Sequence, residues 1–166
     1  MDDTTKILDV KHLSVAIQTT NGLHQVINDI SFAINKGETF ALLGESGCGK
    51  TMTALAINQL LPLNAHYLAG SSIQLGSQQL LELSEIAMRE IRGKKIGMIF
   101  QEPMTSLNPV TTIGYQIAET LKRHNGYSQG SRKQKIIELL TAVGIADASR
   151  RYNQYPHQLS GGMKQR

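Results

Sequence analysis

Eight consecutive residues have the types and spacing that bind a phosphate group, in the pattern G-x-x-x-x-G-K-[ST]. They are Gly44, Glu45, Ser46, Gly47, Cys48, Gly49, Lys50 and Thr51. Glycines let the backbone curl so that successive N–H groups point inward at phosphate oxygens. Lys50 is expected to reach the β and γ phosphates of a nucleotide, and Thr51 to place its hydroxyl on Mg²⁺. The alternative is a glycine-rich turn between a strand and a helix that holds no ligand.

A phosphate loop needs a strand before it and a helix after it, because the helix adds its positive end to the site. The apolar run 40–43 predicts a buried parallel strand, and residues 50–61 predict a helix. Upstream, residues 7–17 and 26–34 predict two strands, and the Asn21-Gly22 turn signal favours a hairpin between them.

Further along the chain, residues 64–82 are typical of irregular structure with short strands. Ser84 is expected to cap a helix that ends near residue 92, and residues 96–100 predict another buried strand. Residues 112–124 and 131–143 predict amphipathic helices. Strands, one α/β crossover and then a mostly helical half indicate an α/β nucleotide-binding core with a helical insertion.

Composition excludes several classes of protein. The 166 residues are 40% hydrophobic, which is typical of a globular chain. Seventeen Lys and Arg against 13 Asp and Glu leave a net charge of +4, too small and too scattered to indicate a nucleic-acid binder. Solvated helix faces explain these charges best, and an anionic membrane surface or a basic coupling face is the alternative. A single cysteine excludes an internal disulfide framework, and five dispersed histidines do not indicate a metal site. No apolar run approaches the roughly 18 residues of a membrane-spanning helix.

Two further strings stand downstream of the phosphate loop: QEPMTSLNP at residues 101–109 and YPHQLSGGMKQR at residues 155–166. In order and spacing, the three motifs resemble the Walker A loop, Q-loop and signature motif of ABC-transporter ATP-binding subunits. The two strings are similar to those of the oligopeptide, dipeptide and nickel importer subfamily. The resemblance runs from about residue 7 to residue 166.

The resemblance implies an α/β fold with a P-loop NTPase core of the ABC ATPase type, N-terminal antiparallel strands and a helical subdomain. We expect residues 1–166 to form one partial ATP-binding domain. Residues 1–100 would hold the β subdomain and the phosphate-loop core. Residues from about 101 to 166 would hold the Q-loop, the helical subdomain and the signature motif.

The resemblance also implies roles for individual residues. ATP and Mg²⁺ are the expected cofactors, with Lys50 and Gln101 as catalytic residues and Thr51 and Gln101 at the metal. Gln101 would contact Mg²⁺ or the attacking water and report its state to the membrane subunits. The signature residues would hold the γ-phosphate of an ATP bound by the opposite subunit; they are Ser160, Gly161 and Gly162.

The sequence departs from the family pattern in two places. Ile17 stands where the family has an aromatic that stacks on adenine, so base recognition is expected to be weaker or carried elsewhere, or Ile17 is simply a strand residue. The sequence stops at Arg166, before the family positions of the Walker B Asp, the catalytic Glu and the switch His. His157 precedes the signature and cannot replace the switch His. We therefore expect the C-terminal part of the core to be missing, ATP binding to be weak and this chain alone to be hydrolytically incompetent.

The implied function is that of an ATP-binding subunit, or a fragment of one, which energises import of peptides or a related small solute. Binding and hydrolysis of ATP would occur at a two-subunit interface. Expected partners are permease membrane subunits, a second ATP-binding subunit or domain and, indirectly, a solute-binding protein, with the chain peripheral on the cytoplasmic face of the plasma membrane. The alternatives are a non-catalytic short form that binds the permease or a partner subunit, and a non-functional gene remnant.

Overall fold

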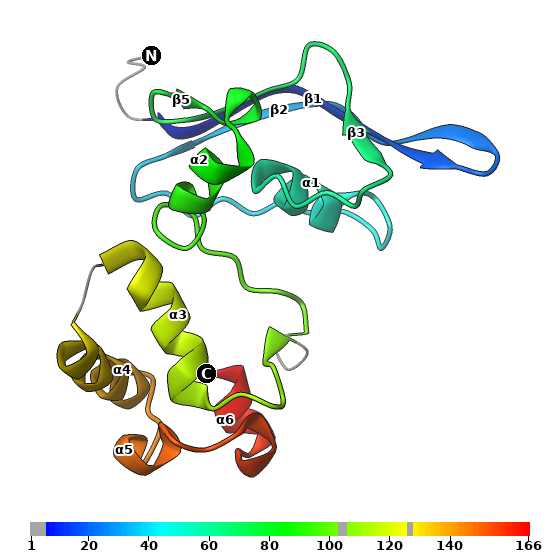
Figure 1. The fold of residues 1–166 in the computed structure, drawn as a ribbon. Helices are drawn as coiled ribbons and strands as arrows, with labels where there is room; N and C mark the ends of the chain where they lie inside the picture. The colour runs from blue at the N-terminus through cyan, green and yellow to red at the C-terminus, as the bar shows by residue number, and fades with distance from the viewer. Residues whose placement is uncertain (1–5, 103–105, 126–127) are drawn as a thin grey trace. The chain divides into compact units, whose positions relative to one another are not determined.

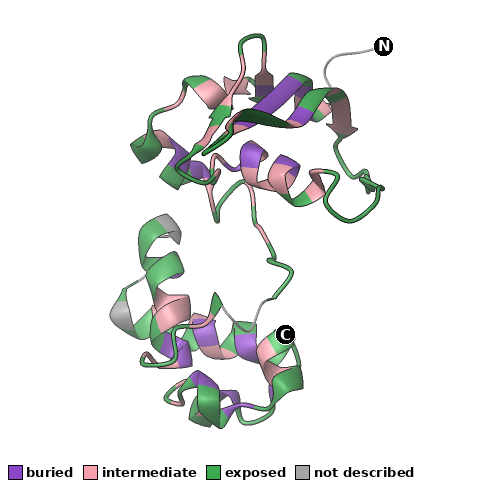
Figure 2. Cartoon of the chain, turned by 90° about the vertical axis from the view of Figure 1, so that its right-hand side faces the viewer, coloured by how far each residue is buried: buried purple, intermediate pink, exposed green. Residues whose placement is uncertain are grey.

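The chain divides into two compact units, Met1–Arg92 and Gly93–Arg166. The structure is a computed structural model that describes residues 6–102, 106–125 and 128–166 (Figure 1). Each unit has its own buried residues (Figure 2). Among the described residues, no helix has the length and apolar character needed to cross a bilayer.

The first unit is built on the predicted hairpin, β1 (Lys6–Thr19) and β2 (Gly22–Asn35), which pair antiparallel. β1 also pairs with β3 (Ala65–Tyr67) and with β4 (Ser72–Leu75), and β5 (Gln78–Gln79) pairs with β4. The resulting sheet has the order β2-β1-β4-β5, with β3 beside β1. Both strand predictions and the predicted short strands over 64–82 are confirmed. The largest fully buried side chains of this unit are Val10, Leu13, Val15, Ile73, Leu80 and Met88.

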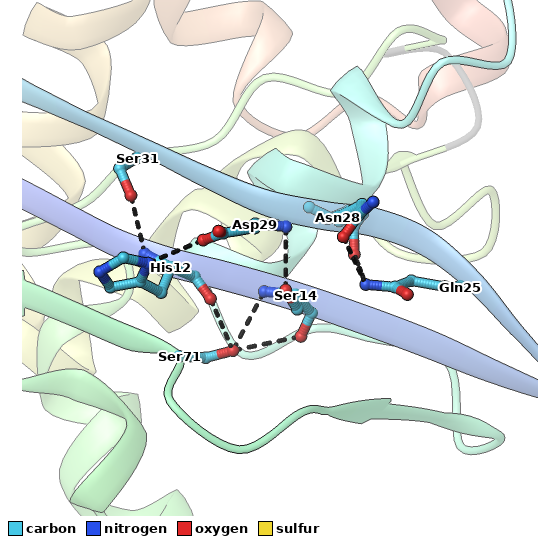
Figure 3. A network of polar contacts seen from close by, with 8 residues as sticks. His12, Ser14, Gln25, Asn28, Asp29, Ser31 and Ser71 are labelled. Carbon is cyan, nitrogen blue, oxygen red and sulfur yellow. Dashed lines mark hydrogen bonds and ion pairs between the residues drawn. The ribbon is translucent and has the colours of Figure 1, made fainter.

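The pairing of β1 with β2 is irregular around His12 and Asp29, which both have left-handed φ angles, 50° and 48°. The two side chains face each other, with His12 Nδ1 2.8 Å from Asp29 Oδ1 (Figure 3). Serine hydroxyls satisfy the backbone here: Ser31 accepts from the His12 N–H, and Ser14 accepts from the Asp29 N–H. Ser71 accepts in turn from the Ser14 N–H. These contacts supply the hydrogen bonds that a regular strand ladder would otherwise make.

Two short helices and a 3₁₀ turn complete the first unit: α1 (Lys50–Ile57), η2 (Leu80–Glu82) and α2 (Glu85–Ile91). α2 begins as predicted, because the Ser84 hydroxyl accepts a hydrogen bond from the Ala87 N–H at 3.3 Å. α1 was expected to continue to residue 61, and this end is wrong. The chain leaves the helix at Gln59, whose φ is 50°, a left-handed conformation that stops the helical hydrogen-bond ladder.

Two predicted buried strands are also wrong. Residues 40–43 and 97–100 lie outside strands, and Ile96 makes only an isolated bridge. Leu43 is 88% exposed and Ile99 is 91% exposed, although the Phe40 ring stacks on that of Phe32 at 4.9 Å. A buried parallel strand needs hydrogen-bonded neighbours. Within the described ranges, no strand pairs with either run.

The second unit is helical: α3 (Ile113–Asn125), α4 (Gln129–Ala142), α5 (Ala148–Arg151), η4 (Pro156–Gln158) and α6 (Gly161–Gln165). The two helices predicted at 112–124 and 131–143 are confirmed within two residues at each end. α4 begins at the Ser128 cap, whose hydroxyl accepts from the Ser131 N–H. The apolar core of this unit is formed by Ile113, Leu121, Ile136, Leu140, Ile145, Ala148 and Leu159.

Gly114 offers a test of the packing of this unit. It lies in α3, and a Cβ built on it would come within 2.5 Å of the Tyr152 ring. We expect Gly114→Ala to lower the free energy of unfolding by roughly 1–3 kcal/mol, because the ring must move. Gly130 lies in α4 with nothing within 4 Å, so Gly130→Ala should raise it by about 0.5–1 kcal/mol through helix propensity alone. Urea denaturation followed by circular dichroism measures both, and equal shifts in the two variants would contradict the packing at Tyr152.

Candidate functional site

The structure brings the predicted phosphate-loop residues together in the segment that leads into α1 (Figure 1). The Cys48 N–H donates to the Glu45 carbonyl at 3.4 Å, which closes a tight turn. Gly47 and Gly49 have φ angles of 84° and 95°, in the left-handed region that favours glycine. The curled backbone that a phosphate-binding loop needs is therefore present, and α1 starts directly after it.

Two glycines of the loop have no room for a side chain. A Cβ on Gly49 would lie 2.8 Å from the Val26 carbonyl oxygen, so the start of α1 is held directly against β2. A Cβ on Gly44 would lie 2.5 Å from the sulfur of Cys48. The loop backbone therefore lies directly against β2 at Gly49, and the Cys48 side chain lies against Gly44.

The ammonium group of Lys50 lies over the loop. It donates to the carbonyl oxygens of Gly44 at 2.8 Å and of Glu45 at 2.5 Å, and it lies 3.5 Å from the sulfur of Cys48. The first turn of α1 contains no acidic residue, so no carboxylate there offsets the positive charge. An anion seated in this loop would meet the Lys50 charge and the positive end of α1 together.

The two threonines at the start of α1 differ in exposure. Thr51, the predicted Mg²⁺ ligand, is exposed. Thr53 is buried, and both its hydroxyl and its backbone N–H donate to the Gly49 carbonyl, at 3.0 Å and 2.8 Å. Sequence reasoning missed Thr53. Its position four residues after Gly49 is the available signal, because a helical threonine commonly bonds to the carbonyl one turn earlier.

The opposite end of α1 is held by a second group of side chains that sequence reasoning missed. Tyr67 donates its hydroxyl to the Ala56 carbonyl at 2.6 Å, and burial raises the pKa of Tyr67 to about 12, so it stays a donor at neutral pH. Arg92 donates to the carbonyls of Asn58 and Gln59, directly after α1, and to the carboxylate of Glu85. Hydrogen bonds from Arg92, and then from Arg89, lower the pKa of Glu85. We call Tyr67, Glu85 and Arg92 the α1 end cluster.

The other predicted site residues belong to different parts of the chain. Gln101 is exposed in the second unit, outside any helix or strand. Ser160 caps α6, because its hydroxyl accepts from the Met163 N–H at 3.3 Å, and Gly161 and Gly162 follow with open space around them. A short helix therefore starts at Ser160, while the γ-phosphate expected there stays a prediction. Ile17 is half-buried in β1, opposite His24 of β2 and Ala65 of β3.

Within the described residues, no group of three or more His, Cys, Asp or Glu could hold a metal ion.

The model of the family described as ABC transporter matches residues 27–166, which is most of the chain. The chain belongs to the ABC transporter family. The family recognition made from the sequence is thus confirmed.

Curated members of the ABC transporter family are similar over nearly the whole chain. The oligopeptide transport ATP-binding protein OppD of Bacillus subtilis is 46% identical over 162 residues, covering 98% of this chain and 45% of that protein. A putative peptide import ATP-binding protein of Brucella ovis is 52% identical over 165 residues, covering 96% of this chain and 49% of that protein. The dipeptide transport ATP-binding protein DppD of Bacillus subtilis is 45% identical over 161 residues, covering 97% of this chain and 48% of that protein. The chain spans about half the length of these relatives.

Solved ABC transporter cassettes share the fold. The dimeric structure of the bacterial cassette MJ0796 has a TM-score of 0.78 at 23% identity, covering 95% of this chain and 65% of that one. The structure of cbiO1 from Clostridium perfringens has a TM-score of 0.69 at 22% identity, covering 97% of this chain and 58% of that one. The predicted ABC ATPase fold is confirmed, and the chain corresponds to only part of a cassette.

Proposed function

We propose that the chain is the ATP-binding part of an ABC importer subunit for peptides or a related small solute. The observation that carries this proposal is the loop from Gly44 to Thr51, which curls around the Lys50 ammonium at the start of α1. The names of the similar curated proteins, which are peptide and dipeptide import ATP-binding proteins, support the class of solute.

In this proposal the loop amides and Lys50 bind the β and γ phosphates of ATP, and the Thr51 hydroxyl contacts Mg²⁺. A bound Mg²⁺ would neutralise charge on the β and γ phosphate oxygens. Gln101 contacts the ion or the attacking water. The capped start of α6 receives the γ-phosphate of an ATP held by a second subunit; its residues are Ser160, Gly161 and Gly162. Hydrolysis belongs to the complete two-subunit assembly, and turnover by these 166 residues alone is expected to be negligible.

The same proposal extends to organisation and partners. Residues 1–100 would act as the β subdomain and phosphate-loop core, and about 101–166 as the Q-loop, helical subdomain and signature motif. The partners would be permease membrane subunits, a second ATP-binding subunit or domain and, indirectly, a solute-binding protein, with no nucleic acid. The chain would lie at the cytoplasmic face of the plasma membrane as a peripheral component.

Competition between nucleotides tests the proposal. A fluorescent ATP analogue would be bound to the 166-residue chain with Mg²⁺ and displaced by ATP, ADP or AMP. ATP should compete at least about 100-fold better than AMP, because charge-assisted hydrogen bonds to the β and γ phosphates supply most of the affinity. ADP should lie between them. Equal competition by ATP and AMP would contradict phosphate recognition by this loop.

A further inference from the structure

We propose that Arg92 is a positioning residue that sets the orientation of α1, and with it the phosphate loop, by holding the C-terminal end of that helix. This inference rests on the proposed nucleotide site and adds to it a residue far along the chain. Arg92 follows α2, and it donates to the backbone carbonyls of Asn58 and Gln59, the two residues directly after α1.

The guanidinium of Arg92 connects α1 to α2 by four hydrogen bonds. Nε donates to the Asn58 carbonyl at 2.7 Å, and Nη2 donates to the Gln59 carbonyl at 3.0 Å. Nη1 lies 2.9 Å and 3.0 Å from the two carboxylate oxygens of Glu85, in the first turn of α2. The Arg92 side chain is only 18% exposed. A planar fork of donors matches this set of acceptors, whereas the single point charge of a lysine does not.

Arg92 binds the carbonyls of the two residues directly after α1, the C-cap Asn58 and Gln59. A helix carries its negative end at this side, so a cation close to it is favourable. Tyr67 adds a hydrogen bond to the Ala56 carbonyl, and the Gln59 side chain donates to the carbonyl of Leu80. The end of α1 is therefore tied to three other segments of the first unit.

The two ends of α1 are held by different means. At the N-terminal end, Gly49 lies directly against the Val26 carbonyl of β2. At the C-terminal end, eight residues later, the α1 end cluster makes the contacts. Eight helical residues span about 12 Å, so a shift at the C-terminal end changes the direction in which the N-terminal amides point. A misplacement of about 1 Å in a site that orients its ligand can cost on the order of 100-fold in function.

A ratio of affinities separates positioning from a purely structural role. If a variant only lowered the folded fraction, the apparent affinities for ATP and AMP would fall by the same factor. If α1 loses its orientation, contacts to the β and γ phosphates weaken while contacts to the rest of the nucleotide remain. The ATP-to-AMP affinity ratio then falls.

The experiment measures this ratio in the parent chain, Arg92→Gln, Arg92→Lys and Arg89→Gln. We expect the ratio to fall roughly tenfold in Arg92→Gln and by about threefold in Arg92→Lys, which keeps the charge but not the fork. Arg89 is the matched control, because it bonds the same Glu85 carboxylate at 3.0 Å from an exposed position. Arg89→Gln should keep the parental ratio.

Each outcome decides the inference. If circular dichroism shows that Arg92→Gln is folded and its ATP-to-AMP affinity ratio equals that of the parent chain, the inference is overturned. If Arg92→Gln does not fold, Arg92→Lys takes its place, and a parental ratio there overturns the inference equally. A parent chain that does not discriminate ATP from AMP rejects the proposed nucleotide site itself, so the two failures are distinguishable.

Discussion

Replacing Lys50 by alanine is expected to lower the affinity of the chain for ATP by roughly 100-fold or more. The reason is that charge-assisted hydrogen bonds to phosphate are worth about 1.5–3 kcal/mol each, and Lys50 is expected to make more than one. Its ammonium already lies over the loop, on the carbonyls of Gly44 and Glu45, so little rearrangement is needed to reach an anion. The measurement is displacement of a fluorescent ATP analogue by ATP.

The matched control for this variant is Lys36→Ala. Lys36 is exposed in the turn between β2 and the loop. The Lys36→Ala substitution removes the same net charge from the same unit as Lys50→Ala does. We expect its ATP affinity to stay within about twofold of the parent, because an exposed charge outside the site is screened by solvent and salt. Equal loss of affinity in Lys36→Ala and Lys50→Ala would mean that general electrostatic attraction, and not the loop, carries the binding.

Replacing Gly49 by alanine is expected to destabilise the first unit more than any other single methyl added to the loop. The left-handed φ of 95° costs a non-glycine residue about 1–2 kcal/mol, and the new Cβ would lie 2.8 Å from the Val26 carbonyl oxygen. Backbone atoms of β2 cannot yield as the end of a side chain can, so overpacking adds roughly 1–3 kcal/mol. Chemical denaturation measures the sum, and ATP binding should be lost along with the position of the helix start.

Gly47→Ala separates the two contributions. Gly47 has a similar φ of 84°, but a Cβ there meets nothing within 4 Å. It should therefore carry only the conformational cost, about 1–2 kcal/mol. If Gly47→Ala and Gly49→Ala lower the free energy of unfolding equally, the close approach of Gly49 to the Val26 carbonyl adds nothing to the cost of a Cβ at that position.

Local signals in the sequence were sufficient for the elements whose partners lie nearby. The β1–β2 hairpin follows from two apolar runs and the Asn21-Gly22 turn, and the start of α2 follows from Ser84. The curled loop before α1 could also be predicted, because glycines at fixed spacing permit its left-handed residues, while phosphate binding by this loop stays a prediction.

The predictions that were wrong depended on partners that local patterns do not specify. An apolar run such as 40–43 predicts burial, but burial in a sheet requires neighbouring strands, and the described residues supply none. The end of α1 is set by the left-handed conformation of Gln59, and this position holds neither a glycine nor a proline that would indicate a helix end. The contacts of Arg92 could not be predicted either, because backbone carbonyls 33 and 34 residues away leave no trace in side-chain types.

The Lys50 ammonium donates to two carbonyl oxygens of the loop. In nucleotide binding, Lys50 would exchange these carbonyl acceptors for phosphate oxygens. The Lys50 ammonium already donates to the carbonyls of Gly44 and Glu45, so an anion that binds it would gain only the difference between its own oxygens and these two. A weakly coordinating anion offers little advantage over two carbonyls, whereas a polyphosphate offers several charged oxygens at once. We therefore expect the loop to favour polyphosphates over singly charged anions, because only several charged oxygens together compete with its own carbonyls.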